Sequence, residues 1–278
     1  MYQITEERIK KFEETLFLEE KAKATIQKYV SGVKRFGEYL GKREISKERV
    51  LEYREHLQKS LKAQSVNGEL SAIHAFLDYF GWQECKIKML KVQRKAFLEE
   101  EKELTKAEYE RLLETAKRKG AERLYLVMMT IGATGIRVSE LKYITIEAVQ
   151  KGRAEIQMKG KNRMILLQKK LRKQLIRYAQ KKKIKPGVLF CTRNGNPLDR
   201  SNICHEMKKL CKNANVDACK VFPHNFRHLF ARTFYTLEKN LAHLADILGH
   251  SRIETTRIYV AVSSTAHEKM LDKMDLVI

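Results

Sequence analysis

Helix-breaking residues are scarce in this chain, and this scarcity constrains the fold more than any other feature. Only 3 prolines and 13 glycines occur among 278 residues, so long uninterrupted helices are expected. Apolar side chains near the N-terminus also recur at the spacing of one helix face. These residues are Ile26, Tyr29, Val30, Val33, Phe36 and Leu40. The pattern predicts a helix that buries one face.

The N-terminal third is predicted to be a bundle of helices. Further helices are expected after Ser46 and across residues 65–80. A charged stretch near residues 90–104 then reads as a linker. We therefore place a helical domain at residues 1–97 and a second domain at residues 98–278.

The second domain is predicted to open with helices. Thr105 and Glu108 stand at the spacing of a capping box, in which each side chain satisfies a backbone N–H at the start of a helix. We expect that helix at residues 105–118 and another at 122–133. A short helix should follow the Thr-Gly break and carry Arg137.

The apolar period changes after this helical stretch. Short runs of alternating or β-branched residues predict short strands. These runs are ITIEAV (144–149), AEIQM (154–158), RMILLQ (163–168) and GVLFC (187–191). A basic helix is expected at 169–182, and the chain reads as helical from Asn202 onward. The fold class is therefore mainly α, with a small β-sheet in the C-terminal domain.

The charge of the chain points to a polyanionic partner. Lys and Arg number 56 against 34 Asp and Glu, which gives a net charge of +22. Residues 151–185 contain 14 basic side chains and one acid, Glu155. Such an excess on one segment favours nucleic acid over a merely well-solvated surface.

Cysteine use and the N-terminus indicate a cytoplasmic protein. The five cysteines are odd in number and lack Cys-x-x-Cys spacing, so neither a disulfide framework nor a zinc site is expected. The N-terminal residues contain no apolar run of signal-peptide length, and no segment is long enough to span a membrane. We expect no cofactor and no metal.

Arg137 stands in the string ATGIRVSEL. A guanidinium can grip two phosphate oxygens at once, which an ammonium cannot. Alone, such an arginine would be a surface or packing residue. Glu140, one turn later, either braces Arg137 by accepting a hydrogen bond or is an ordinary helix glutamate.

His224 and Arg227 lie three residues apart, so they share one helix face. Pro223 before them suits the first position of a helix. A lone buried histidine is more often structural than catalytic. We interpret the neighbouring His228 as a packing or supporting residue.

His250 follows a Leu-Gly break, and Tyr259 comes nine residues later in LGHSRIETTRIYV. A bare tyrosine in an apolar string would ordinarily be a core aromatic. The Leu-Gly-His string upstream favours a functional tyrosine instead.

Taken in order, these residues resemble the tyrosine recombinases, the phage integrase family. The set comprises Arg137, Lys159, His224, Arg227, His250 and Tyr259. Lys159 lies in MKGKNR, where the family has a glycine in place of Met158; Lys161 is the alternative candidate. The resemblance implies a SAM-like core-binding domain followed by a catalytic domain.

The resemblance also implies a mechanism. Tyr259 would attack a DNA phosphate and form a 3′-phosphotyrosine, and a Holliday junction would be an intermediate. Arg137, Arg227 and His250 would stabilise the phosphate without metal or ATP, and His224 would act as general base or phosphate donor. Lys159 would donate a proton to the leaving oxygen.

The implied partner is double-stranded DNA with an inverted-repeat site. The protein would form a homo-tetramer on DNA and stay mostly monomeric when free. A tail at 264–278 would be a helix that docks either on its own domain or on a neighbouring protomer. Its apolar residues are Met270, Leu271, Met274, Leu276 and Val277.

Two other readings stay open. A catalytically silent DNA-binding accessory protein or regulator would share the charge and the helices, but it would not need the complete set of six residues. A type IB topoisomerase or hairpin telomere resolvase shares the chemistry, but usually carries additional domains.

Overall fold

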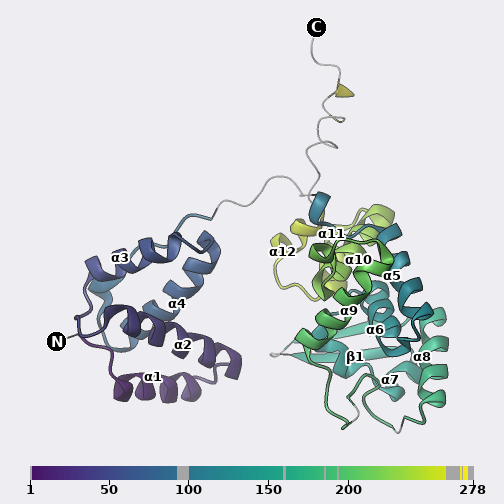
Figure 1. Ribbon diagram of the computed structural model, residues 1–278, viewed down its shortest axis with the longest axis horizontal. Coiled ribbons are helices and arrows are strands. Elements are labelled where there is room, and N and C mark those ends of the chain that lie inside the picture. The colour runs from purple at the N-terminus through teal and green to yellow at the C-terminus, as the bar shows by residue number, and fades with distance from the viewer. Residues whose placement is uncertain are drawn as a thin grey trace. The chain divides into compact units, whose positions relative to one another are not determined.

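The chain divides into two compact units, Met1–Arg94 and Lys95–Ile278. Figure 1 draws both units of the computed structural model. Residues 2–92, 100–158, 161–184, 186–192, 194–260, 270 and 272–274 are described.

The first unit contains four α-helices within residues 2–92. They are α1 (Glu6–Leu18), α2 (Lys23–Leu40), α3 (Lys47–Gln58) and α4 (Ala63–Tyr79), followed by a short 3₁₀ helix, η1 (Gln83–Cys85). The predicted start after Ser46 is confirmed, because the Ser46 hydroxyl accepts a hydrogen bond from the backbone of Arg49. The predicted face of α2 is also confirmed, since Val33 and Phe36 are each 1% exposed. This face packs into the core of the bundle.

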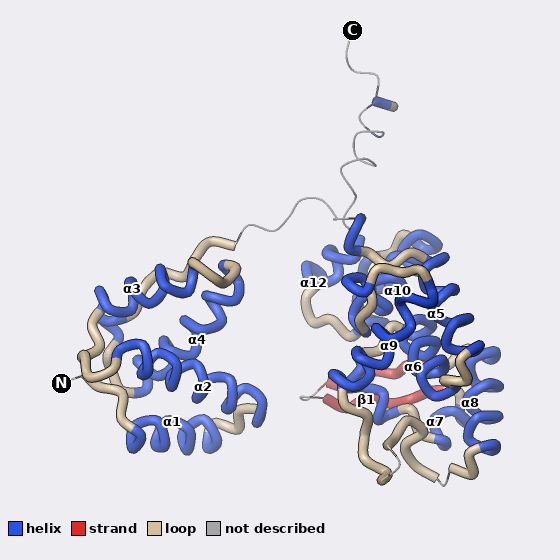
Figure 2. The backbone as a smooth tube through the Cα atoms, in the orientation of Figure 1, coloured by secondary structure: helices blue, strands red, loops and turns tan. Residues whose placement is uncertain are grey.

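The second unit begins with helices and continues into a β-hairpin. Its first elements are η2 (Glu100–Lys102), α5 (Lys106–Arg118), α6 (Glu122–Thr134), η3 (Val138–Tyr143) and α7 (Ile146–Lys151). Strands β1 (Arg153–Met158) and β2 (Lys161–Leu166) then pair antiparallel. Figure 2 shows this hairpin in red beside the helices of the unit.

The described residues after β2 form helices joined by loops, which agrees with the helices predicted at 169–182 and from Asn202 onward. These helices are α8 (Lys169–Lys181), α9 (Arg200–Ala214), η4 (Ala218–Lys220), α10 (Pro223–Glu238), α11 (Leu241–Leu248), α12 (Ile253–Arg257) and η5 (Ile258–Val260). One large apolar cluster joins α5, α6, the hairpin and α8 to α10. A smaller cluster forms where α10 and α11 meet Tyr259. The predicted class, mainly α with a small sheet, is confirmed.

Two predicted strands are wrong. Residues 144–149 comprise the C-cap of η3, the N-cap of α7 and the first four residues of α7. They form a helix start because the Thr145 hydroxyl caps α7, and Gly152 ends that helix in the left-handed region. Residues 187–191 form no strand; Val188 and Cys191 make only single bridges, to Thr145 and Pro197. No helix in the described ranges has both the length and the apolar character needed to cross a membrane.

The capping box predicted at the start of α5 is present, and its contribution to stability can be tested. The Thr105 hydroxyl accepts from the Glu108 backbone at 3.2 Å, and the Glu108 carboxylate accepts from the Thr105 backbone at 2.8 Å. We predict that Thr105→Ala lowers the unfolding free energy of the second unit by about 1 kcal/mol. Denaturant unfolding measures this. Gln168→Ala is the matched control, because Gln168 stands before α8 without a side-chain cap. Equal losses in the two variants would contradict the prediction.

Candidate active site

Arg227 is a fully buried cation on α10, 1% exposed. Pro223 occupies the first turn of that helix, where its missing N–H is not needed. One Nη of Arg227 donates to the carbonyl of Gly135 at 2.5 Å, and the other donates to the carbonyl of Leu248 at 2.7 Å. Both carbonyls stand at helix ends, of α6 and α11, where backbone acceptors lack intrahelical partners. Arg227 therefore joins three helices at one point.

His250 contacts the same guanidinium. Its Nε2 lies 2.9 Å from Nη2 of Arg227, and its Nδ1 lies 2.8 Å from the Thr256 hydroxyl. Because a guanidinium only donates, Nε2 must accept, and Nδ1 carries the proton. His250 is therefore a neutral imidazole held in one tautomer. It is presented by the turn after Gly249, which ends α11 in the left-handed conformation.

Arg137 and Glu140 form a bracket at the start of η3. Arg137 donates to Glu140 twice, from its backbone N–H at 2.7 Å and from Nη1 at 3.1 Å. Of the two interpretations of Glu140, these contacts support the one in which it braces Arg137. The Glu140 side chain is 2% exposed, whereas that of Arg137 is 39% exposed. The carboxylate is thus fixed inside the protein, and the guanidinium faces the solvent.

Arg163 is a further cation in this group that the sequence reading missed. It lies on β2, forms an ion pair with Glu140, and donates to the Ile247 carbonyl at 2.8 Å. Burial lowers the pKa of Arg163, and the charge of Glu140 opposes this effect. The sequence signal for its burial is its position in the strand, where alternate residues face the core.

Tyr259 is buried among three histidine rings. Its side chain lies in η5 and is 3% exposed. Its ring centroid is 4.6 Å from that of His228, 5.7 Å from His250 and 6.1 Å from His224. His228 also contacts Glu103, with Nδ1 at 3.2 Å from a carboxylate oxygen. This agrees with the interpretation of His228 as a supporting residue.

Two parts of the sequence-based site lie outside the described residues. Lys159 is one, and the side chain of its alternative, Lys161, is also not described. The register pairs Met158 with Lys161. Most of the predicted tail helix at 264–278 also lies outside, so its docking stays a prediction.

A cleft of about 660 Å³ opens beside these residues. Its lining includes Arg137, Glu140, Arg163 and His250, together with Asp246. Glu140 is already paired with both arginines. The lining thus has two cations and two acids, and the excess positive charge of the site comes from Arg227, whose guanidinium contacts the lining residue His250. A buried cation without a carboxylate partner favours an anion.

The positive charges perturb one another. Burial lowers the pKa of Arg227 to about 10, and the charge of Arg137 adds to this effect, whereas Tyr259 opposes it. Burial lowers the pKa of His250 to about 4, with further contributions from Arg227 and Arg137. His224 is more exposed, and desolvation by its neighbours followed by the charge of His228 also lowers its pKa.

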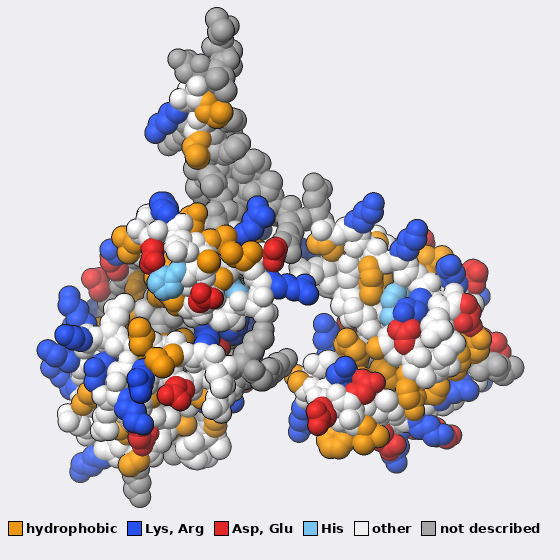
Figure 3. Space-filling view, turned by 180° about the vertical axis from the view of Figure 1, so that it is seen from behind, with side chains coloured by type: hydrophobic (Ala, Val, Ile, Leu, Met, Phe, Trp, Pro, Cys, Tyr) orange, Lys and Arg blue, Asp and Glu red, His pale blue; other side chains and the backbone are white. Residues whose placement is uncertain are grey.

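The surface outside the cleft is also basic. In the space-filling view, Lys and Arg side chains gather along the edge of the second unit where α8 lies (Figure 3). Exposed members of α8 are Lys169, Lys170, Lys173, Arg177 and Lys181.

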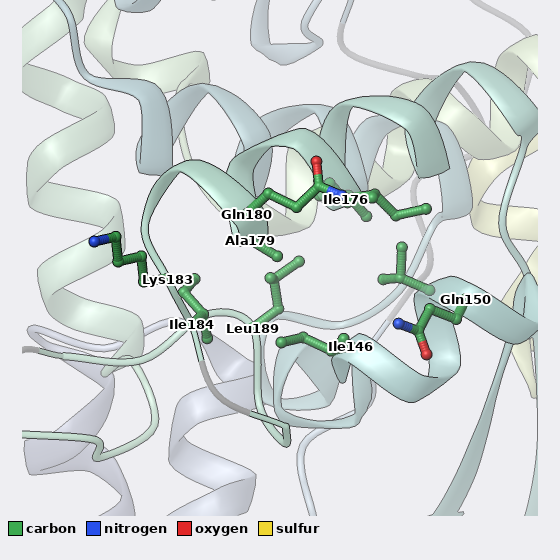
Figure 4. Close-up of a pocket in the computed structure, with 10 residues that line it drawn as sticks. Ile146, Gln150, Ile176, Ala179, Gln180, Lys183, Ile184 and Leu189 are labelled. Carbon is green, nitrogen blue, oxygen red and sulfur yellow. The ribbon is translucent and has the colours of Figure 1, made fainter.

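A second cavity, about 190 Å³, lies between α7 and α8 and is lined mainly by apolar side chains such as Ile146, Ile176 and Leu189 (Figure 4). None of the candidate site residues lines it.

The described residues contain no group of three His, Cys, Asp or Glu side chains arranged to hold a metal ion.

The lowered pKa of His250 gives a pH prediction. The ring should stay neutral in the free protein down to about pH 5, well below the ordinary histidine pKa of about 6.5. Because the unfolded chain then binds more protons, stability should be lost as pH falls from about 6.5 toward 4. The ¹⁵N shifts of the ring, followed against pH, measure the midpoint. A midpoint near 6.5 would show that the ring is not desolvated as described.

Comparisons with known proteins agree with this geometry. The phage integrase family matches residues 102–266, and the N-terminal SAM-like domain of phage integrases matches residues 9–84. Tyrosine recombinase XerA of Thermococcus kodakarensis is 28% identical over 279 residues, which cover 97% of this chain and 95% of the relative.

Solved structures show the same fold. XerH site-specific recombinase bound to difH substrate, in a pre-cleavage complex, superposes with a TM-score of 0.70 at 21% identity, covering 91% of this chain and 80% of that chain. A lambda integrase tetramer bound to a Holliday junction gives a TM-score of 0.72 at 16% identity, covering 91% of this chain and 76% of that chain. The match to the phage integrase family extends over more than half of this chain. The chain therefore belongs to the phage integrase family of tyrosine recombinases.

Proposed function

We propose that this chain is a site-specific recombinase that cleaves and rejoins DNA strands through Tyr259. The Tyr259 oxygen would attack the scissile phosphorus, and the bond from phosphorus to the 5′ oxygen would break. The tyrosine loses its proton, the 5′ oxygen gains one, and a 3′-phosphotyrosine remains. A 5′ hydroxyl from another strand then reverses the step, which produces a Holliday junction without loss of bond energy.

The observation that carries this proposal is the placement of Arg227 and His250 against Tyr259, which affects the pKa of Arg227 through its charge and a side-chain hydrogen bond. His250 lies beside both the Arg227 guanidinium and the Tyr259 ring. Preorganised donors of this kind stabilise charge as it builds up on phosphoryl oxygens, and loss of one such donor typically costs about 10²–10³ in rate. The Nε–H of Arg227 has no acceptor among the described residues, so a buried donor is left for a ligand.

The roles of the remaining residues follow from their positions. Arg137 faces the cleft and would clamp the phosphate with Arg227. His250 would donate to a phosphate oxygen once the phosphate charge raises its proton affinity. His224 is exposed, and its ring centroid lies 6.1 Å from that of Tyr259; it would take the tyrosine proton or contact the phosphate. Lys159, or Lys161 in its place, would protonate the leaving oxygen.

DNA binding and assembly form the second half of the proposal. Residues 1–97 would bind the core of an inverted-repeat site, and residues 98–278 would carry out catalysis. Four strand cuts are needed to recombine two duplexes, so four protomers would assemble on DNA. The free chain, at net charge +22, would repel its own copies and stay mostly monomeric. The protein would act in the cytoplasm, without metal or ATP.

The role of Tyr259 is tested by Tyr259→Phe. The wild-type protein first selects its bound sequence from a library of random duplexes, and a duplex of that sequence is then nicked beside the cleavage position. We predict that the wild-type protein forms a covalent adduct visible in denaturing gels. Tyr259→Phe should bind the duplex with wild-type affinity but form no adduct. Tyr235→Phe, in the same small apolar cluster, is the matched control and should form it.

An undiminished adduct with Tyr259→Phe would refute the assignment. Binding without adduct in the wild-type protein would instead support a catalytically silent DNA-binding protein.

Metal and energy independence are tested on the same duplex. Because side-chain cations would stabilise the phosphate, adduct formation should proceed at an unchanged rate in excess EDTA and without ATP. Loss of the adduct in EDTA, with recovery on addition of Mg²⁺, would contradict this expectation and indicate a metal-dependent nuclease.

A further inference from the structure

Arg163 occupies an unusual position for a charged residue. Along β2, Ile165 is 3% exposed, whereas Met164 and Leu166 are 50% and 73% exposed. The alternation of a strand therefore turns Arg163 toward the buried face, opposite the buried Ile156 of β1. Its side chain is only 11% exposed. A buried guanidinium is costly unless its donors are matched, so this placement requires specific partners.

The partners of Arg163 belong to two other segments of the site. Its Nη2 forms an ion pair with Glu140, the carboxylate that also holds Arg137. Its Nη1 donates to the carbonyl of Ile247, near the end of α11 and three residues before His250. Gly249 leaves room for this side chain, because an added Cβ there would lie 2.5 Å from Cδ of Arg163.

We propose that Arg163 is a positioning residue for DNA cleavage: it locks the β-hairpin to the Arg137 turn through Glu140 and to the His250 turn through Ile247. This inference rests on the proposed function. Arg163 acts through other residues and does not itself contact the scissile phosphate. Its planar fork reaches two acceptors on separate segments at once, which the single ammonium of a lysine cannot reproduce.

The charge balance gives a physical reason for the link. Glu140 is buried and shared between two arginines. Without Arg163, Arg137 would be the one cationic partner that the described residues leave to this carboxylate, and the Arg137 guanidinium would be drawn inward, away from the cleft. The Ile247 carbonyl would also lose a buried donor. Both changes displace groups proposed to hold the phosphate.

A matched control exists in the same unit. Arg172 donates from Nε to the carbonyl of Val149 at 2.9 Å and from Nη2 to that of Gln150 at 2.5 Å, at the end of α7. It also packs against a left-handed glycine, Gly152. Arg172 thus performs the same structural task at a helix end, but the carbonyls that it contacts belong to no residue of the site.

The test uses the full-length protein and the nicked duplex selected by the wild type. Arg163→Met should slow single-turnover cleavage about 100-fold, the scale of a misplacement of about 1 Å, while affinity for the duplex stays within about threefold. Arg163→Lys keeps the charge and the aliphatic stem, yet should recover little of the rate. Arg172→Lys should cleave at the wild-type rate.

Two further measurements separate positioning from a plain structural role. In a Glu140→Gln background, Arg163→Met should cost far less than 100-fold, because the link through the carboxylate is already broken. In the protein without DNA, the ring signals of His250 should shift in Arg163→Lys and stay unchanged in Arg172→Lys.

Several outcomes would overturn the inference. A fall in affinity parallel to the fall in rate would make Arg163 a direct phosphate contact. Equal losses of rate in Arg163→Lys and Arg172→Lys would mean that Arg163 only stabilises the fold. Cleavage at the wild-type rate by Arg163→Lys would show that the two-pronged guanidinium is not needed. If the wild-type protein forms no adduct, the proposed function fails, and the His250 signals still decide whether the link exists. Arg163→Lys keeps the test open if Arg163→Met does not fold.

Discussion

The burial of the Arg227 guanidinium is the interaction on which the rest of the site depends. Removing an ion from water costs several kcal/mol, and the usual remedy is a carboxylate. Here the hydrogen-bond partners of Arg227 are instead the carbonyls of Gly135 and Leu248, the ring of His250 and the side chain of Tyr259. The two carbonyls stand at helix C-termini, where the backbone carries a partial negative charge. Because this charge is only partial, α6 and α11 hold the cation without neutralising it, and it remains available to an anion.

The uncompensated charge links stability to function. Arg137 and Arg163 share one buried carboxylate, Glu140, whereas Arg227 is held by carbonyls. Burial lowers the pKa of Arg227, and the charges of Arg137 and Arg163 add to this effect. A DNA phosphate would supply the missing negative charge. The site would therefore be more stable with the phosphate bound, and the binding energy would act where charge develops in the transition state.

Local signals in the sequence predicted much of this arrangement. The apolar face of α2 and the capping box of α5 needed only nearby residues, so both predictions are confirmed. Motif spacing also brought together His250 and Tyr259, which are ring neighbours in the structure. The strand predicted at residues 144–149 is wrong because the run contains β-branched residues typical of strands, whereas Thr145 caps a helix there. Arg163 was missed because its importance comes from contacts with segments 23 and 84 residues away. Only its place in the alternation of buried and exposed residues along the strand indicated that its side chain is buried.

The site is built where regular structure stops. Gly135 ends α6 and Gly249 ends α11, both at φ near +64°, a conformation that side chains rarely adopt. Each glycine also permits a close approach, since an added Cβ would lie 2.4 Å from the Phe230 ring at Gly135 and 2.5 Å from Arg163 at Gly249. Helix ends offer carbonyls that lack partners, and arginines supply the donors that satisfy them. The same guanidiniums that close the helix ends therefore hold Arg137 and His250 in place. For this reason the fold of the second unit and the geometry of its candidate active site cannot be altered independently.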